Sequence, residues 1–252
     1  MKEKHLQGEL RDFLKTKSVP LVGIAPISHQ LPDVPEDFSP EQILGGARSV
    51  VCYGAPIPKG IVHAKAHSLA LYWRYCNTVY RALDTSSNQL CLHLEGRGYA
   101  ASPIYSCFPW KVMDRKFWGL SPLVYWAEQA GLGKLTRSGL LATPDHGTRV
   151  LLGGVITTAD LEPTEKRDGE PCPPGCSACI DVCPARAIER TGKVDHNLCI
   201  RHSGANPLLA HVLSDTGTKE KFSFETVLNT VAVDDHGSYT CFECARACPL
   251  NR

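Results

Sequence analysis

Two cysteine-rich stretches near the end of the chain decide its fold: Cys172-Pro-Pro-Gly-Cys-Ser-Ala-Cys-Ile-Asp-Val-Cys-Pro184 and Cys241-Phe-Glu-Cys-Ala-Arg-Ala-Cys-Pro249. With Cys199 between them, they hold eight of the twelve cysteines in 252 residues. Both stretches end in Cys-Pro after closely spaced cysteines. In a chain kept in a reducing compartment, cysteines at such spacing serve as metal ligands rather than as disulfide partners.

The spacing is typical of a protein with two [4Fe–4S] clusters. In the bacterial ferredoxin pattern, the last cysteine of one block binds the cluster of the other block. The three-residue gap between Cys172 and Cys176 is longer than usual, and Pro173-Pro174-Gly175 predicts a tight bulge there. Zinc held by Cys-x-x-Cys pairs and a disulfide framework are the alternatives. Two zinc sites would need neither the Cys-Pro endings nor the crossed pattern.

Each cysteine of this segment is then used once as a ligand. The predicted ligands of cluster one are Cys172, Cys176, Cys179 and, from the far block, Cys248. The predicted ligands of cluster two are Cys183, Cys241, Cys244 and, as the one cysteine left nearby, Cys199. The remaining cysteines stand alone in apolar surroundings, and we expect them to be small buried hydrophobic residues. They are Cys52, Cys76, Cys91 and Cys107.

The first 165 residues predict a mixed α/β (α+β) domain, and residues 166–252 a small ferredoxin-like domain with both clusters. Amphipathic spacing predicts helices over residues 1–18, 68–96 and 122–130. Apolar and β-branched runs predict strands over residues 19–24, 49–54, 99–105 and 150–157. Residues 161–170, rich in charge and proline, are the expected linker between the two domains.

The overall charge gives no reason to expect a nucleic acid or an anionic membrane as partner, since the net charge is +1 with 27 basic and 26 acidic side chains. The basic clusters 134–137 and 115–116 are expected to be solvated. No signal peptide, twin-arginine leader or membrane-spanning stretch is visible, so we expect a cytoplasmic protein. No ligand spacing links His63, His67, His93 and His146, which are expected to be structural or exposed.

The order of motifs resembles the epoxyqueuosine reductase superfamily, which includes the reductive dehalogenases as relatives. Residues 127–133 read Ala-Glu-Gln-Ala-Gly-Leu-Gly, a strand follows at 149–157, and the cysteine stretches come after it. The separation of Cys183 from Cys199 and the final Cys-x₂-Cys-x₃-Cys-Pro also resemble that family. The similarity is good over residues 120–252 and weak before them.

The resemblance implies a nitroreductase-like domain that holds a corrinoid (cobalamin) and two clusters that reduce its cobalt one electron at a time, to Co(I). It places the corrinoid against residues 131–139. Gly131, Gly133 and Gly139 would let a flat macrocycle approach the backbone, or they serve only turns and caps. The side chains offered to the amide and phosphate periphery of the corrinoid are Lys134, Arg137 and Ser138.

The chain departs from the family in three places. The family commonly has a tryptophan, an isoleucine, a glycine and a lysine after Gly133, but this chain has Lys134-Leu-Thr-Arg137. The region that matches the family's aspartate proton donor, residues 117–122, has no acid, and Asp114 is the nearest carboxylate. The carboxyl-terminal helical repeats that help some relatives hold tRNA are absent. We therefore do not expect tRNA as a partner.

Two functions remain open. In the first, the chain is a reductase that binds its own corrinoid and acts on a small substrate. In the second, it delivers electrons to the corrinoid of another protein, such as a methyltransferase, which would need no proton donor. Both imply a low-potential electron donor, ferredoxin or flavodoxin, and the second implies a corrinoid protein as partner.

Overall fold

The structure, a computed structural model, describes residues 2–251 except 18, 28–30, 32–33, 106–109, 115, 120 and 204–240. Its centre is a four-stranded sheet in the order β1-β2-β8-β3, in which every neighbouring pair is antiparallel. The strands are β1 (Leu21–Pro26), β2 (Ser49–Pro56), β3 (Ala101–Ile104) and β8 (Val150–Thr157). All four lie where the apolar runs predicted them, so the mixed α/β class is confirmed.

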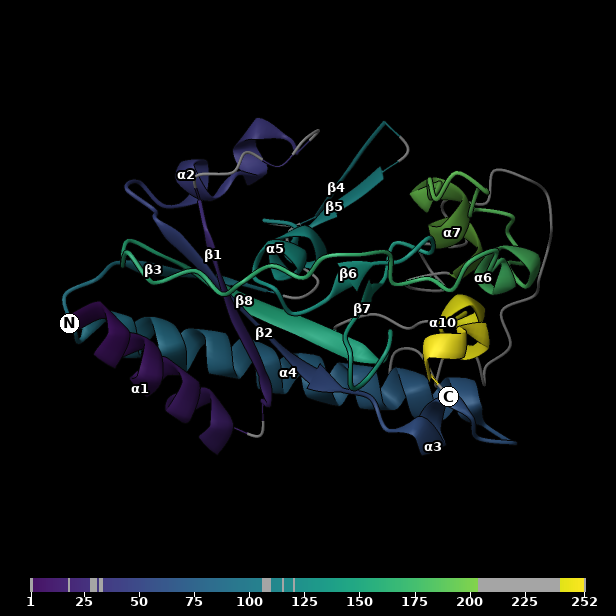
Figure 1. Ribbon diagram of the computed structural model, residues 1–252, viewed down its shortest axis with the longest axis horizontal. Helices are drawn as coiled ribbons and strands as arrows, with labels where there is room; N and C mark the ends of the chain where they lie inside the picture. The colour runs from purple at the N-terminus through teal and green to yellow at the C-terminus, as the bar shows by residue number, and fades with distance from the viewer. Residues whose placement is uncertain are drawn as a thin grey trace, which may run out of the picture.

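Helices cover both faces of this sheet (Figure 1). On one face lie α1 (Lys2–Thr16) and the long α4 (Ser68–Glu95), and on the other lies α5 (Leu123–Gln129). Side chains along β2 alternate between the two layers. Val51 and Tyr53 join the core under α1 and α4, and Val50 and Cys52 join the core under α5. Because both faces are buried, β2 reads as a continuous apolar run.

Close approach of α4 to β8 depends on Gly153. A Cβ atom at this position would lie 2.7 Å from the Tyr53 ring and 3.2 Å from the Leu83 Cβ atom. The Tyr53 hydroxyl is buried and bonds to the Leu83 carbonyl and to Ser87 Oγ on α4. The glycine therefore makes room for the tyrosine that ties the helix to the sheet.

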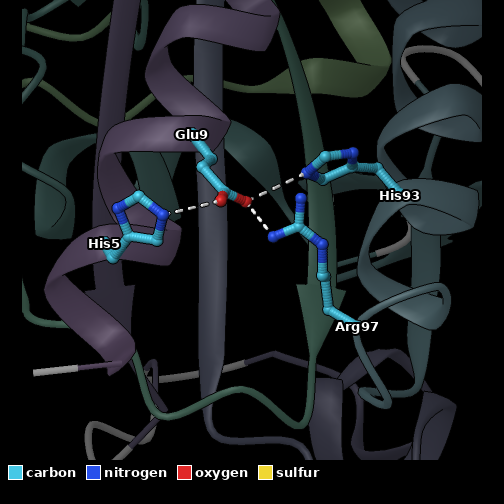
Figure 2. Close-up of polar contacts among 4 residues, drawn as sticks. All are labelled: His5, Glu9, His93 and Arg97. Atoms are coloured by element: carbon cyan, nitrogen blue, oxygen red, sulfur yellow. Dashed lines mark hydrogen bonds and ion pairs between the residues drawn. The ribbon is translucent and has the colours of Figure 1, made fainter.

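An ionic cluster fixes α1 on the end of α4 (Figure 2). Glu9 of α1 accepts a bond from Arg97, and its carboxylate lies 3.1 Å from His5 Nε2 and 3.7 Å from His93 Nε2. The His93 ring also stacks on Phe13, with ring centroids 5.5 Å apart. This histidine is structural, as the sequence predicted.

Two short antiparallel pairs and several short helices complete the described residues. The pairs are β4 (Trp110–Met113) with β5 (Lys116–Gly119), and β6 (Lys134–Leu135) with β7 (Leu141–Ala142). The helices are η1 (Glu36–Phe38), α2 (Pro40–Ile43), α3 (Lys59–Val62), α6 (Ala178–Asp181), α7 (His196–Ser203), α10 (Glu243–Ala247) and η2 (Pro249–Asn251). None of the helices in the described part is long and apolar enough to cross a bilayer.

The expected linker lies against the sheet instead of hanging free. Thr164 donates its N–H to the Ile24 carbonyl and accepts the Ile24 N–H on its hydroxyl, at 2.9 and 3.0 Å. Leu161 donates its N–H to Ser49 Oγ at 3.0 Å. The chain thus follows the edge of β1 on its way to the cysteines, and the division at residue 165 stays a prediction.

Three of the four isolated cysteines are buried, as expected: Cys52, Cys76 and Cys91. Burial raises the pKa of Cys91 to about 12, and the neighbouring Glu95 carboxylate contributes to this shift. These thiols behave as small apolar side chains. Cys107 lies outside the described residues, and so does Arg115 of the predicted basic cluster.

Candidate metal centre

The eight cysteines of the two stretches form two groups in space. The first group lines a single cavity, and its members are Cys172, Cys176, Cys179 and Cys248. Burial raises the pKa of the Cys179 thiol, and Cys172, Cys176 and Cys248 raise it further through their charge. A thiol from the second stretch therefore lies with three from the first. This is the crossed arrangement that the spacing predicted for cluster one, although iron binding itself stays a prediction.

The second group gathers the other four thiols. Burial raises the pKa of Cys199, and the thiols of Cys183 and Cys241 add to this shift. Burial raises the pKa of Cys244 to about 12, with further contributions from Cys199 and Cys241. Residue 199 is exposed overall, so this group lies close to the surface on the side of α7.

Proline explains how one stretch serves both groups. A residue before proline is pushed out of the helical region, because the proline ring clashes with its backbone. Cys248 follows α10 and precedes Pro249, and its backbone is extended, with φ −63° and ψ 121°. The helix α10 also packs against α6, which carries Cys179. The chain therefore leaves α10 with its last thiol directed to the first group.

Backbone and side-chain donors lie close to two of the thiols. The Ala187 N–H points at Cys183 Sγ, with an N···S distance of 3.3 Å. The Cys248 thiol interacts with the Leu250 N–H and the Thr148 hydroxyl, both of which lower its pKa against the effect of burial. Donors to ligand sulfurs are among the groups with which proteins tune a cluster.

One wall of the first cavity comes from the loop that the resemblance assigned to a corrinoid. Thr136, Arg137 and Ser138 line this cavity beside the four cysteines. Arg137 donates to the Cys176 carbonyl, and the hydroxyls of Thr136 and Ser138 lie 2.9 Å apart. Two of the predicted corrinoid ligands, Arg137 and Ser138, therefore face the cysteines.

The glycines of this loop are required by contacts within the protein. A Cβ atom on Gly131, whose φ is +70°, would lie 2.1 Å from the Glu165 carbonyl oxygen. One on Gly133 would lie 2.1 Å from the Ala142 carbonyl oxygen, and one on Gly139 would lie 3.6 Å from Val194. Close backbone packing thus accounts for Gly131 and Gly133 without a ligand. Their assignment to a corrinoid stays a prediction.

A second cavity of about 310 Å³ lies next to the first, and Leu250 lines both. Its wall includes two cationic side chains, Lys134 and Arg167. Lys134 Nζ lies 3.4 Å from a Glu128 carboxylate oxygen, and Arg167 Nε donates to the Gly131 carbonyl at 2.9 Å. The six predicted corrinoid residues do not share one cavity, since Lys134 lines the second and Arg137 and Ser138 the first. Arg167 was missed because it lies in the expected linker.

In the described part of the chain, no three histidine, cysteine, aspartate or glutamate side chains are placed to hold a single metal ion. A cubane differs from such a site, since each of its four thiolates binds a different iron. The arrangement that the structure provides is four thiols around a cavity.

Comparisons with known proteins were made in sequence and in structure. Over 221 residues, the chain is 25% identical to the epoxyqueuosine reductase of Gloeobacter violaceus (strain ATCC 29082 / PCC 7421), covering 84% of the chain and 59% of the relative. Over 78 residues, it is 41% identical to the epoxyqueuosine reductase of Synechococcus sp. (strain RCC307), covering 30% of the chain and 23% of the relative. The predicted resemblance is confirmed. No family model matches the chain.

Solved structures agree on the fold. A crystal structure of epoxyqueuosine reductase with a tRNA-Tyr epoxyqueuosine-modified stem loop has a TM-score of 0.63 at 19% identity, covering 98% of this chain and 66% of that one. A reductive dehalogenase structure has a TM-score of 0.58 at 15% identity, covering 96% and 31%. The chain spans less than two thirds of the length of the Gloeobacter and Synechococcus relatives.

The expectation that tRNA is not a partner is wrong. A protein with this fold has been solved with a tRNA stem loop bound. The expectation depended on the missing acid in residues 117–122, on the helical repeats of some relatives and on the net charge of +1. A net charge does not describe the local surface that a nucleic acid meets.

Proposed function

We propose that the chain is an iron–sulfur reductase that carries low-potential electrons through two [4Fe–4S] clusters to an acceptor beside cluster one. The observation that carries this proposal is the sorting of the cysteines, with Cys248 of the second stretch in the first group and Cys183 of the first stretch in the second group. The similarity to epoxyqueuosine reductases and reductive dehalogenases supports a reductase-type function.

The cavity favours clusters over the zinc alternative. Zinc takes four thiolates at about 2.3 Å from one ion, so their sulfurs converge on a point. Among the described residues, no three such side chains are placed to hold one ion, and Cys172, Cys176, Cys179 and Cys248 line one cavity. When bound there, a [4Fe–4S] cluster would accept and release one electron at a time. Arg137 and the hydroxyls of Thr136 and Ser138 would close the cavity on its remaining side.

Electron transfer requires that the two centres be close together. The Cys179 thiol of the first group adds to the raised pKa of Cys244 in the second group. The two thiols therefore lie near enough to interact electrostatically. The packing of α6 on α10 holds them there. This contact supports a route from cluster two to cluster one through the two short helices.

The acceptor that the resemblance implies is a corrinoid, and the loop 131–139 does not fit it as predicted. Gly131 and Gly133 are covered by main chain, and Arg137 is bound to Cys176. The second cavity, at about 310 Å³, is at the small end of ligand sites. It would admit a small molecule or one edge of a larger one. In that cavity, Lys134 and Arg167 would orient an anionic group beside Leu250 and cluster one.

The second candidate function is electron delivery to a corrinoid held by another protein. Residues 131–139 make close contacts with other parts of this chain. This favours electron delivery, because that function needs no corrinoid site in this chain. It also needs no proton donor, and Asp114, the nearest carboxylate to the family's acid position, lies in the turn between β4 and β5. A tRNA substrate, as in the relative with the bound stem loop, is the third partner to test.

The test of the clusters is metal analysis of protein purified without oxygen. We expect about eight irons and eight sulfides per chain, with the broad visible absorbance of [4Fe–4S] centres. An iron content of about four per chain would show that the protein holds one cluster and not two. About two zinc ions per chain and no visible absorbance would show that the cysteines form two Cys₄ zinc sites and no iron–sulfur cluster.

The test of the acceptor compares three additions to the reduced protein. Free cob(II)alamin that becomes reduced, and stays bound through gel filtration, would support the chain's own corrinoid site. Reduction of a corrinoid protein but not of free cobalamin would support electron delivery. Binding of a tRNA stem loop, measured by fluorescence anisotropy, would support a modified nucleoside of tRNA as the substrate. Reduced clusters that reoxidise with none of these acceptors would overturn the corrinoid and tRNA proposals together.

A further inference from the structure

The second cavity, of about 310 Å³, has a lining that is partly apolar and partly cationic. Ala142, Pro144 and Leu250 supply apolar surface, and Lys134 and Arg167 supply two positive charges. Ligand sites in proteins combine these features, because apolar walls bury the body of a ligand and a few polar groups fix its orientation. The lining residues therefore indicate the chemistry of the ligand.

Arg167 is held in an orientation that leaves donors for a ligand. Its Nε donates to the Gly131 carbonyl at 2.9 Å. In the described part of the chain, this is the hydrogen bond that the guanidinium makes. The bond fixes the plane of the guanidinium and leaves its outer N–H groups unused. A carboxylate can accept two parallel hydrogen bonds from such a fork.

The charges around the cavity favour a ligand with one negative charge. Lys134 Nζ lies 3.4 Å from a carboxylate oxygen of Glu128 on α5, so the charge of this lysine is already paired. The same oxygen accepts the Leu135 N–H at 2.9 Å, which holds the carboxylate in place. Asp168 also lines the cavity, and its carboxylate repels a second negative charge. A carboxylate carries one charge, whereas a phosphate monoester carries nearly two at neutral pH.

The wall around Leu250 is fixed without a ligand. A Cβ atom on Gly147 would lie 2.2 Å from the Leu250 carbonyl oxygen, so the two backbones are in direct contact. The buried Asn251 accepts the Thr148 N–H on Oδ1 at 2.8 Å. Its Nδ2 donates to the Ala245 carbonyl at 2.6 Å. Because these contacts form the wall in advance, a ligand loses little affinity to ordering it.

We propose that the second cavity binds a small monocarboxylic acid with an apolar body. Arg167 holds the carboxylate with its outer N–H groups, Lys134 adds positive charge, and the apolar body lies against Leu250. Leu250 also lines the cavity of the first cysteine group, so the acid lies beside cluster one. The inference rests on the proposed function only where it makes this acid the substrate of the reductase, because the binding site itself requires no cluster.

The experiment is isothermal titration calorimetry of the full chain, purified without oxygen, with benzoate as the probe. Benzamide is the neutral probe of similar shape, and inorganic phosphate is the anion without an apolar body. We expect saturable binding of benzoate, weaker binding of phosphate and no binding of benzamide. The difference between benzoate and benzamide measures the contribution of the charge.

Substitutions of the two cations test the assignment. Arg167→Gln removes the charge and the fork, and it should weaken benzoate binding at least about tenfold, the loss expected for a charge-assisted hydrogen bond. Arg167→Lys keeps the charge without the fork and should lie between the wild type and Arg167→Gln. Lys134→Met should weaken binding by a smaller factor, since Glu128 already pairs with this lysine. Arg190→Gln is the matched control, because Arg190 is exposed and does not line the cavity.

Equal binding of benzoate and benzamide would overturn the proposal. Tighter binding of phosphate than of benzoate would also overturn it, and so would unchanged affinity in both Arg167→Gln and Lys134→Met. Circular dichroism checks the fold of each variant, and if Arg167→Gln is unfolded, Lys134→Met decides.

Iron analysis of the same samples separates this proposal from the proposed function. Benzoate binding by a protein without iron would support the carboxylate site and contradict the proposed function. Full iron content without benzoate binding would overturn the carboxylate site and leave the proposed function standing.

Discussion

At the scale of single residues, the thiols are distinguished by their neighbours. Cys199 and Cys52 have similar chemistry, but the Cys199 thiol interacts with Cys183 and Cys241, whereas Cys52 is buried in the apolar core under α5. Clustered thiols disfavour thiolates because their charges repel, and bound metal reverses this by supplying positive charge. Position in the fold, not the residue type, thus determines which cysteine can be a ligand.

Replacing Cys199 should therefore damage one cluster and not the other. We expect Cys199→Ala to lower the iron content from about eight to about four per chain and to remove the paramagnetic signal of cluster two only. Cys52→Ala should keep both clusters. Iron analysis and spectra of the reduced proteins check this. Full iron content with unchanged spectra in Cys199→Ala would mean that another group completes cluster two.

At the scale of elements, α1 is held by apolar burial more than by charge. Leu6, Leu10 and Leu14 recur at every fourth residue and are at most 5% exposed. The ion pair between Glu9 and Arg97 is the polar contact of this helix (Figure 2). Both side chains are partly exposed to water, which weakens the attraction between their charges. The helix face that the sequence pattern predicted is the one that carries most of the stability.

Two substitutions in α1 should separate these contributions. Leu10→Ala leaves a cavity in the core and should lower the free energy of unfolding by about 2–5 kcal/mol. Glu9→Gln should lower it by about 1 kcal/mol or less, as for partly exposed ion pairs. Asp12→Ala, at an exposed pair with Lys15, is the control and should change little. Denaturant unfolding measures all three, and a larger loss for Glu9→Gln than for Leu10→Ala would reverse the ranking.

At the scale of the whole molecule, Phe242 and Asn251 are among the described residues that connect the cysteine segments to the rest of the chain. Phe242 joins the core under α4 and stacks on Tyr72 with ring centroids 4.4 Å apart. Asn251 binds Thr148 next to β8. The helices α6, α7 and α10 otherwise gather at one end of the molecule (Figure 1). Order in this part should depend on metal, because metal binding supplies folding free energy when the ligands are brought together.

Removing the iron should loosen this end and leave the sheet intact. With an iron chelator, we expect faster hydrogen exchange in residues 172–203 and 241–251 and unchanged exchange in β2 and β8. The cores on both faces of the sheet consist mainly of residues outside the cysteine segments, so they persist. Hydrogen exchange with mass spectrometry, with and without iron, measures this. Equal acceleration in β2 and in residues 172–203 would show that the cluster supports the whole fold.

The sequence alone was sufficient for features that depend on neighbours along the chain. The cysteine spacing predicted the two groups of thiols, and apolar periodicity predicted the strands, α1 and α4. These signals are local, because a helix or strand shows its buried face at a fixed period and a loop around a metal needs ligands a few residues apart. The resemblance to epoxyqueuosine reductases also depended on such local motifs.

Only the tertiary structure decided the features that join distant segments. The strand order β1-β2-β8-β3, the contact of Arg137 with Cys176, and the bonds of Asn251 to Thr148 each connect residues whose separation leaves no local pattern. The glycines at 131 and 133 show the same limit, since the sequence does not reveal whether a ligand or a carbonyl oxygen occupies the space beside them. Contacts of this kind form only after folding has brought the two chain segments together, so the first group of cysteines could be predicted from the sequence but its surroundings could not.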